Sequence, residues 1–303
     1  MNKKNIALLA LLILLVVVFM FSRKKENIEK RINFFKFTPE NIHSFDILTS
    51  DDTLKIELVD SKWQISKPLI APVKDNQINR FLNDFIKVET SNIPISESIN
   101  RQTFYNVNDS TGTIINIYGQ NQKLLQKVLY GKSNNYNYAY LRKYNDNKIY
   151  QINNLQSVIT PSAKTWREDK ILNIIESDIN SISIVNNQDS FELIQNELYW
   201  NLSYADSVQT IENSNKTFST FKNSLLNLRS SNFVDNQYDE YKDKFDQTTH
   251  EIIINLKNED KIQLKAISLS DTEYLLMRNN EQHTLYKLNK YQFEQLFITP
   301  DKL

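Results

Sequence analysis

SKWQIS, residues 61–66, is matched by ELYWNLS, residues 197–203, and this repetition of one pattern decides the fold. Trp63 and Trp200 hold the same position in the two segments, about 137 residues apart. Two more pairs follow in the same order at that interval: TIINIY (113–118) with EIIINL (251–256), and KIYQIN (148–153) with TLYKLN (284–289). Similar segments at a fixed interval are the signature of repeated structural units. The sequence therefore predicts two tandem copies of one supersecondary unit, residues 41–160 and 178–303.

The first copy alternates between strand and helix signals. Period-two spacing of apolar residues predicts strands, and one apolar stripe at helical spacing predicts an amphipathic helix over 75–86. A short polar helix is expected over 96–105. The expected strands are 42–49, 54–59, 62–66, 113–118, 124–130, 137–143 and 148–152.

The second copy repeats this order. Phe218, Phe221, Leu225 and Leu228 form the stripe of a helix over 216–228, and short helices are expected over 238–245 and 289–297. The expected strands are 179–185, 190–195, 198–203, 251–256, 261–267, 274–278 and 284–288.

These patterns predict an α+β fold in which each copy is an antiparallel sheet of about seven strands with one main amphipathic helix. Residues 161–177 join the copies. Because this segment is not rich in Gly, Ser or Pro, a helical or extended connector is expected and a flexible linker is not.

Composition narrows the function classes. The 303 residues carry 36 basic and 36 acidic side chains. This balance argues against nucleic acid as a partner, because binding to phosphates requires a basic surface. There is no cysteine, which excludes disulfides, thiolate zinc sites and cysteine nucleophiles. The three glycines lie 7 and 12 residues apart, too sparse for a phosphate-binding loop. No cofactor is expected.

The first 31 residues are expected to form a membrane anchor. Ile6–Phe21 is an uninterrupted run of 16 apolar residues bounded by Lys3, Lys4 and Arg23. As a helix it covers roughly 24 Å, which snorkelling basic side chains extend towards the thickness of a bilayer core. A cleaved signal peptide is the competing interpretation, but the small-residue cleavage signal is missing, so an uncleaved single-pass anchor is favoured. The flanking charges are nearly balanced and leave the orientation open.

No residue constellation predicts catalysis. His43, His250 and His283 lack metal-ligand spacing, and no serine lies in a nucleophile motif, so catalytic, metal and cofactor sites are all predicted to be absent.

Aromatic residues supply the remaining candidates. Tyr136, Tyr138 and Tyr140 alternate and are expected to share one strand face, which would suit a glycan, a peptide or a partner protein. Ordinary cross-strand aromatic packing is the alternative interpretation, and it carries more weight. Trp63 and Trp200 are interpreted as core markers of the repeat.

Five segments in this order resemble a domain-of-unknown-function family of bacterial membrane-anchored proteins associated with gliding-motility-type (Gld-type) ABC transporter subunits. The segments are KWQISKP (62–68), DNQINRFLNDFIKV (75–88), VLYGKSNNYNYAYLRKYNDNKIYQI (128–152), TWREDKIL (165–172) and DINSISI (178–184). The resemblance covers nearly all of the chain after the apolar run, and it implies a membrane-tethered, extracytoplasmic protein. It supplies no catalytic residues. The glycine that follows a strand in this family is present as Gly131 and is replaced near Ser268 in the second copy.

Together these observations predict a non-enzymatic accessory or scaffold protein of the bacterial cell envelope. It is expected to cross the cytoplasmic membrane once, with its remaining residues outside the cytoplasm. The partner expected from the resemblance is a membrane protein, with ABC transporter subunits as the first candidates. The alternative is an envelope module that binds glycan or peptide through the tyrosines.

Overall fold

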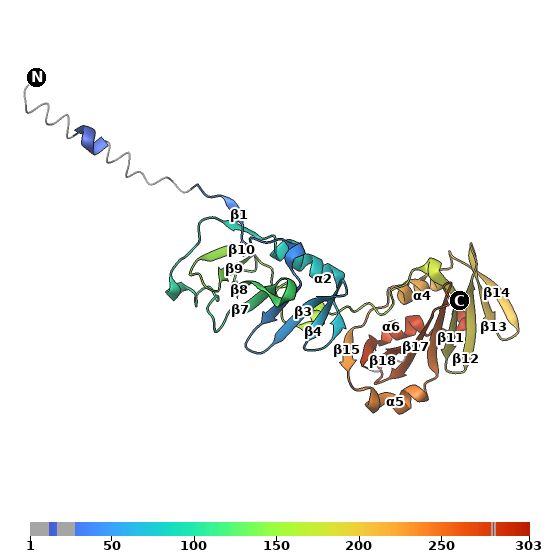
Figure 1. Ribbon diagram of the computed structural model, residues 1–303. Coiled ribbons are helices and arrows are strands. Elements are labelled where there is room, and N and C mark those ends of the chain that lie inside the picture. Colours follow the sequence, from blue (N-terminus) through green and yellow to red (C-terminus); the bar gives the residue numbers. More distant parts are fainter. Residues whose placement is uncertain (1–11, 17–27, 280, 282) are drawn as a thin grey trace, which may run out of the picture. The chain divides into compact units, whose positions relative to one another are not determined.

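The computed structural model describes residues 12–16, 28–279, 281 and 283–303. It separates into two compact units, Met1–Glu168 and Asp169–Leu303 (Figure 1). Each unit has its own antiparallel sheet and its own apolar core. The predicted anchor, Ile6–Phe21, lies outside the described residues except for residues 12–16, which are helical. Within the described part of the chain, no helix combines the length and the apolar character needed to cross a membrane.

The first unit contains an eight-stranded sheet with the order β10-β9-β8-β7-β2-β3-β4-β5. Strands β2 to β5 form one meander and strands β7 to β10 form another, and the two meanders meet where β2 pairs with β7. The bounds are β2 Ser44–Leu48, β3 Thr53–Val59, β4 Lys62–Lys67, β5 Ala71–Pro72, β7 Thr113–Tyr118, β8 Leu124–Lys132, β9 Tyr138–Lys143 and β10 Ile149–Asn153. A separate two-stranded ladder joins β1 (Arg31–Asn33) to β6 (Glu89–Ser91).

The second unit contains a nine-stranded sheet with the order β14-β13-β12-β11-β16-β17-β18-β19-β15. Its two meanders, β11 to β14 and β16 to β19, meet where β11 pairs with β16, and β15 adds to the outer edge of β19. The bounds are β11 Ile179–Asn186, β12 Asp189–Gln195, β13 Tyr199–Tyr204, β14 Ser207–Glu212, β15 Asn232–Asp235, β16 His250–Leu256, β17 Lys261–Ser268, β18 Glu273–Arg278 and β19 Thr284–Asn289.

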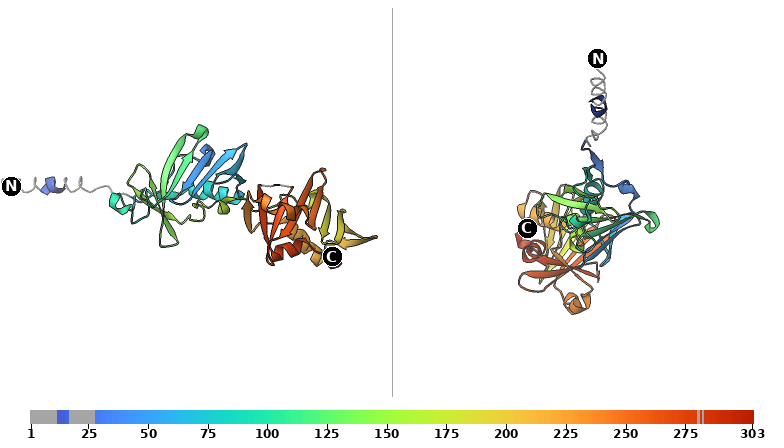
Figure 2. Two further views of the ribbon diagram at one scale, coloured as in Figure 1. Left: turned by 90° about the horizontal axis from the view of Figure 1, so that it is seen from below. Right: turned by 90° about the vertical axis from the view of Figure 1, so that its left-hand side faces the viewer.

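The two sheets share one topology. When the strands of each meander pair are numbered within their own unit, both sheets have the order 8-7-6-5-1-2-3-4. Each sheet is twisted, as Figure 2 shows from two further directions. The predicted antiparallel sheets are confirmed, and strand predominates over helix. The predicted number of about seven strands was too low, because β5, β14 and β15 were missed.

Helices cover these sheets. In the first unit, α2 (Asp75–Arg80) continues as a π-helical turn, η2 (Phe81–Phe85), where one helix had been expected. Phe81 stacks on Phe45 of β2 with ring centroids 3.8 Å apart, at the centre of the core. In the second unit, α4 (Lys216–Leu226) supplies the buried Phe218, Phe221 and Leu225 to the main core. Leu296 of α6 (Lys290–Leu296) is buried in the same cluster.

The opposite face of each sheet carries a smaller cluster. In the second unit, Phe245 of α5 (Tyr238–Asp246) packs on Leu275, Met277 and Leu285. In the first unit, the segment that follows η3 (Ile99–Arg101) covers the equivalent face. We call its contacts the outer cluster, formed by Val107, Leu129 and Ile149 with Tyr105, Ile114, Tyr140 and Tyr144 around them.

The predicted connector is ordered and contributes to both cores. Trp166, the last residue of α3 (Ala163–Trp166), is fully buried in the first unit, 5.5 Å from the ring of Phe45. Ile171 and Leu172 are buried in the core of the second unit. The short 3₁₀ turns are η1 (Pro39–Asn41), η4 (Gln120–Gln122), η5 (Glu176–Asp178) and η6 (Pro300–Lys302).

Candidate functional site

The three candidate tyrosines do not share one strand face. Tyr138 and Tyr140 lie on β9 and alternate with residues that face the main core. Tyr136 lies in the turn before β9, contrary to the expected alternation. The side chains of Ser133 and Asn135 accept hydrogen bonds from the backbone N–H groups of Asn135 and Asn137, at 3.1 and 3.0 Å. Such local side-chain bonds favour turns over strands.

The three rings also differ in burial. Tyr136 is 85% exposed and Tyr138 is 40% exposed, whereas Tyr140 is part of the outer cluster. Its ring contacts the edge of Tyr105 with centroids 4.7 Å apart. Tyr140 is thus a packing residue, and Tyr136 is the ring most available to a ligand.

A polar hollow in the first unit is linked to the backbone of Tyr136 through Asn154. Its volume is about 510 Å³, and its lining consists of amide, hydroxyl and ammonium side chains. Asn154 connects the hollow to the turn, because its Nδ2 donates to the backbone oxygen of Tyr136 at 2.8 Å. The lining residues are Lys132, Asn154, Gln156, Ser157, Thr160 and Thr165.

The side chain of Asn154 is fixed by two hydrogen bonds to its oxygen. Its Oδ1 accepts from the hydroxyl of Tyr130 and from the backbone N–H of Gln156, both at 2.9 Å. The Tyr130 oxygen in turn accepts from the backbone N–H of Leu155 at 3.2 Å. Burial raises the pKa of Tyr130 to about 12, so this phenol stays protonated and remains a donor.

The other side of the hollow is fixed to the helices. Gln77 of α2 donates to the backbone oxygen of Ser157 at 2.7 Å, and Arg80 donates to its hydroxyl at 2.8 Å. The indole N–H of Trp166 donates to the backbone oxygen of Thr160 at 2.9 Å. The lining contains donors and acceptors and neither a carboxylate nor an imidazole, so its residues suit hydrogen bonding to a polar ligand.

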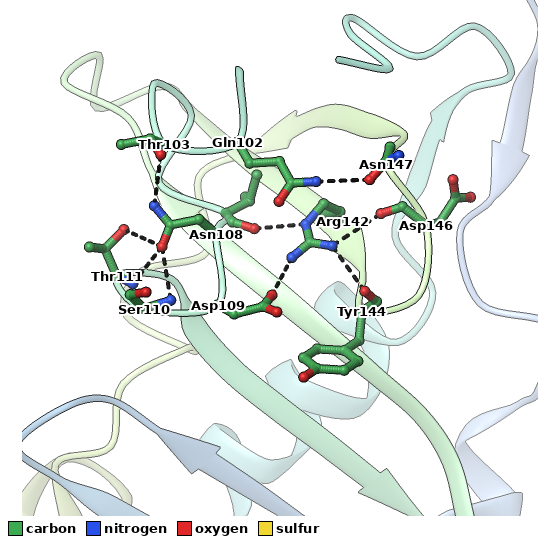
Figure 3. Close-up of polar contacts among 11 residues, drawn as sticks. Gln102, Thr103, Asn108, Asp109, Ser110, Thr111, Arg142, Tyr144, Asp146 and Asn147 are labelled. Carbon is green, nitrogen blue, oxygen red and sulfur yellow. Dashed lines mark hydrogen bonds and ion pairs between the residues drawn. The ribbon is translucent and has the colours of Figure 1, made fainter. Parts of the chain in front are cut away.

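Arg142 of β9 forms a second polar centre, which the sequence analysis missed (Figure 3). It is 3% exposed, and its guanidinium donates to the backbone oxygens of Val107, Tyr144 and Asp146 at 2.7 to 3.1 Å. Its Nη2 also pairs with the carboxylate of Asp109 at 2.5 Å.

This centre is architectural. Arg142 uses all three nitrogens to fix the 107–112 loop and the 144–147 turn against the sheet (Figure 3). Gln102 adds a 3.0 Å bond to Asn147 across the same gap. The available signal was weak, because Arg142 is followed by Lys143 at the end of the strand YAYLRK and its charge does not stand out. Strand alternation assigns such a residue to solvent unless a covering segment is recognised.

The two repeat-marker tryptophans lie on corresponding strands. Trp63 is on β4 and Trp200 is on β13, each the third strand of its unit's first meander. Trp200 is fully buried against Phe218, with centroids 5.5 Å apart. Trp63 is partly buried and lies 6.0 Å from the ring of Phe45.

The histidines are not brought together as ligands. His250 packs against both Phe293 and Phe297, with ring centroids 5.0 and 5.4 Å away. Burial lowers its pKa. The ring of His43 lies 3.4 Å from the backbone oxygen of Asn41. In the part of the chain that the structure describes, no three His, Asp or Glu side chains form a group able to hold a metal ion.

Comparison with known proteins identifies one family. The model of a family described as Domain of unknown function (DUF4340) matches residues 63–248, which span both units. No curated protein and no solved structure matches the chain significantly. The match supports the resemblance to a family of unknown function, and the association with Gld-type ABC transporter subunits stays a prediction.

Proposed function

The chain belongs to the DUF4340 family, and on this premise we propose that it is a membrane-anchored, non-enzymatic scaffold of the bacterial cell envelope. The apolar run Ile6–Phe21 would hold it in the cytoplasmic membrane, and the two units would lie outside the cytoplasm. Their partner would be a membrane protein, with an ABC transporter subunit as the first candidate.

The observation that carries this proposal is the presence of two large antiparallel sheets with one strand order. Both units have the same strand order, and Trp63 and Trp200 lie on corresponding strands. We infer that the units are homologous copies of one module. Two such sheets on one anchored chain provide broad, rigid faces, which suit interfaces of several hundred Å² per partner.

Membrane fractionation tests the anchor. The full-length chain is expected in the membrane pellet, resistant to high salt, whereas a variant that starts at Ile28 is expected in the supernatant. A reporter that is active only outside the cytoplasm, fused after Leu303, is expected to be active in the full-length chain. Equal partition of both chains, or an inactive reporter, would refute this part of the proposal.

Affinity purification tests the scaffold. The full-length chain with a carboxyl-terminal tag is extracted in mild detergent, and co-purifying proteins are quantified by mass spectrometry. A membrane protein in stoichiometric amount is expected. A chain carrying the same apolar run fused to an unrelated soluble domain is the control, because it removes proteins that bind only the anchor. Recovery of no membrane protein above this control contradicts the scaffold proposal.

A second candidate function rests on the polar hollow. Tyr136 is 85% exposed, and its backbone is hydrogen-bonded to Asn154 of a hollow lined by amide, hydroxyl and ammonium groups; this combination suits a glycan or a peptide. Tyr136→Ser is expected to weaken binding of a cell-wall glycan fragment about tenfold, since a stacked aromatic anchor contributes about 1.4 kcal/mol or more. The matched control is Tyr291→Ser, an exposed tyrosine on α6. Equal affinities for the two variants by calorimetry would exclude this site.

A further inference from the structure

The two sheets differ at the edge formed by the fourth strand of the first meander. In the first unit this edge is β5, which has two residues and contains Pro72. In the second unit it is β14, which has six residues, Ser207–Glu212, and no proline. At the opposite ends of the sheets, Ser96 bridges to β10 in the first unit and β15 pairs with β19 in the second. Natural proteins protect sheet edges with prolines, charges or short strands, and β14 has none of these along its centre.

Alternate residues of β14 present their backbone groups to solvent. β13 and β14 are joined by the two-residue turn Ala205–Asp206, so the flanking pair Tyr204–Ser207 is a hydrogen-bonded pair of the antiparallel ladder. Ser207, Gln209 and Ile211 then bond to β13, and Val208, Thr210 and Glu212 point their N–H and C=O groups away from the sheet.

The outward backbone groups at the centre of β14 are available for pairing, whereas one at its end is already used. The backbone oxygen of Glu212 accepts from the N–H of Asn215 at 3.0 Å. Among the described residues, the backbone groups of Val208 and Thr210 have no partner. The side chain of Val208 is 68% exposed on the same strand. The edge is therefore an open strand whose central residues are uncharged.

We propose that β14 pairs with β14 of a second copy of this chain, antiparallel, about a two-fold axis at Thr210. This inference goes beyond the proposed function and does not rest on it. In this register Thr210 lies opposite Thr210 of the second copy, and Val208 lies opposite Glu212. The outward-pointing N–H and C=O groups of these residues then face the outward-pointing groups of the second copy. The contact is the same from both sides, as a two-fold interface requires.

The side chains favour a second copy over an unrelated strand. Directly opposed threonines are a favourable cross-strand pair. The only charge on β14 is Glu212, and antiparallel pairing puts the two copies of Glu212 at opposite ends, roughly 13 Å apart at about 3.3 Å per residue. Like charges are therefore not opposed. A contact of one strand is smaller than a standard stable interface, so the association depends on concentration and covalent capture is the sensitive measurement.

Single-cysteine variants test this register directly, because the native chain has no cysteine. Thr210→Cys in the full-length chain is expected to form a disulfide-linked dimer on mild oxidation, since directly opposed residues lie about 5.5 Å apart at Cα. The control is Asn201→Cys, which lies opposite Thr210 on β13. Its two copies would be about 15 Å apart, beyond disulfide reach, and no dimer is expected.

A mixing experiment tests the antiparallel direction. Val208→Cys and Glu212→Cys, oxidised together, are expected to give several-fold more linked dimer than either variant alone. Adding Thr210→Pro to both chains is expected to abolish this dimer. The fold should survive, since the N–H that proline removes faces away from β13, and circular-dichroism melting checks this. The proposal is overturned if Thr210→Cys dimerises no more than Asn201→Cys, or if Thr210→Pro leaves the mixed dimer unchanged.

Discussion

At the scale of single residues, two tyrosine–aspartate pairs make the same kind of hydrogen bond but differ in burial. Tyr118 donates to Asp46 at 3.0 Å, and Tyr204 donates to Asp189 at 2.9 Å. Burial, reinforced by the Asp46 carboxylate, raises the pKa of Tyr118 to about 12. The second oxygen of Asp46 is buried and has no partner among the described residues. The Tyr118 hydroxyl is therefore the hydrogen-bond donor on which this carboxylate depends.

Tyr118→Phe is expected to lower the free energy of unfolding by about 1–3 kcal/mol, because it leaves a partly buried carboxylate without its donor. Tyr204→Phe is the control, and it is expected to change stability little, since water replaces the lost partner of an exposed pair. Urea unfolding of the full-length chain measures both. Equal losses in the two variants would show that burial does not set the difference.

His250 is expected to make stability depend on pH. Burial lowers its pKa in the folded chain, so the unfolded chain, with a pKa near 6.5, binds the proton more readily. Stability is then greatest above about pH 6.5 and falls as the pH is lowered towards the pKa of the folded state. His250→Phe, which keeps an aromatic ring against Phe293 and Phe297, is expected to reduce this fall. Urea midpoints at pH 5.0 and 7.5 measure the effect, and an unchanged difference in His250→Phe would exclude His250 as the cause.

Residue type predicted whether a side chain is buried better than it predicted the element in which the residue lies. Trp200 was expected in the core and is buried there, because a large apolar ring gains most from leaving water. Tyr136 was expected on a strand and lies in a turn, because the Ser133 and Asn135 side chains compete for the backbone. The buried role of Arg142 depends on a loop folded over it, and the adjacent charges of Arg142 and Lys143 do not reveal this role in the sequence.

At the scale of elements, Gly131 sets how closely the 105–107 segment approaches β8. A Cβ atom at this position would lie 2.0 Å from the backbone oxygen of Tyr105 and 2.8 Å from a methyl carbon of Val107. A backbone atom cannot move aside cheaply, so Gly131→Ala is expected to destabilise the chain by roughly 1–3 kcal/mol. Gly119→Ala, whose nearest contact would be 3.1 Å, is expected to cost less. Denaturant titration ranks the two variants, and the reverse order would contradict this account.

Strands with apolar alternation were predicted within two residues of their observed ends. This accuracy is expected, since one buried face fixes both the period and the length of a strand. β14 was missed because SVQTIE places only Ile211 in the core. β5 and β15 were missed because two and four residues are too few to show a period. The π-helical turn after α2 keeps Phe81 and Phe85 in the core, and no helical stripe distinguishes it from an ordinary turn.

At the scale of the whole molecule, each unit has the parts of an independent domain. The described strands of each unit pair only with strands of the same unit, and each unit has a core of its own. Residues 28–168 and 169–303, expressed separately, are each expected to give a strand-rich circular-dichroism spectrum and a cooperative thermal transition. A fragment that remains unfolded would show that its core depends on the other unit.

The order of elements along the chain was predictable, and the pairing at the centre of each sheet was not. Repeated signals at a constant interval predicted a tandem arrangement, because each signal is local, and two sheets with one strand order fit that prediction. The β2–β7 and β11–β16 ladders join strands that are far apart in sequence, and hydrophobic pattern does not specify such partners. Function is harder still, since the matched family is a domain of unknown function and supplies no chemistry.

These central ladders also govern assembly during translation. Every other ladder of the first sheet joins neighbours in sequence, so its hairpins can form as soon as they leave the ribosome. The sides of β2 and β7 that face each other stay unpaired until Tyr118 has emerged, about 70 residues after the last residue of β2. The nascent chain therefore carries an unpaired strand edge for several seconds at ordinary elongation rates. The same wait recurs in the second unit, where β11 stays unpaired on one side until β16 has emerged.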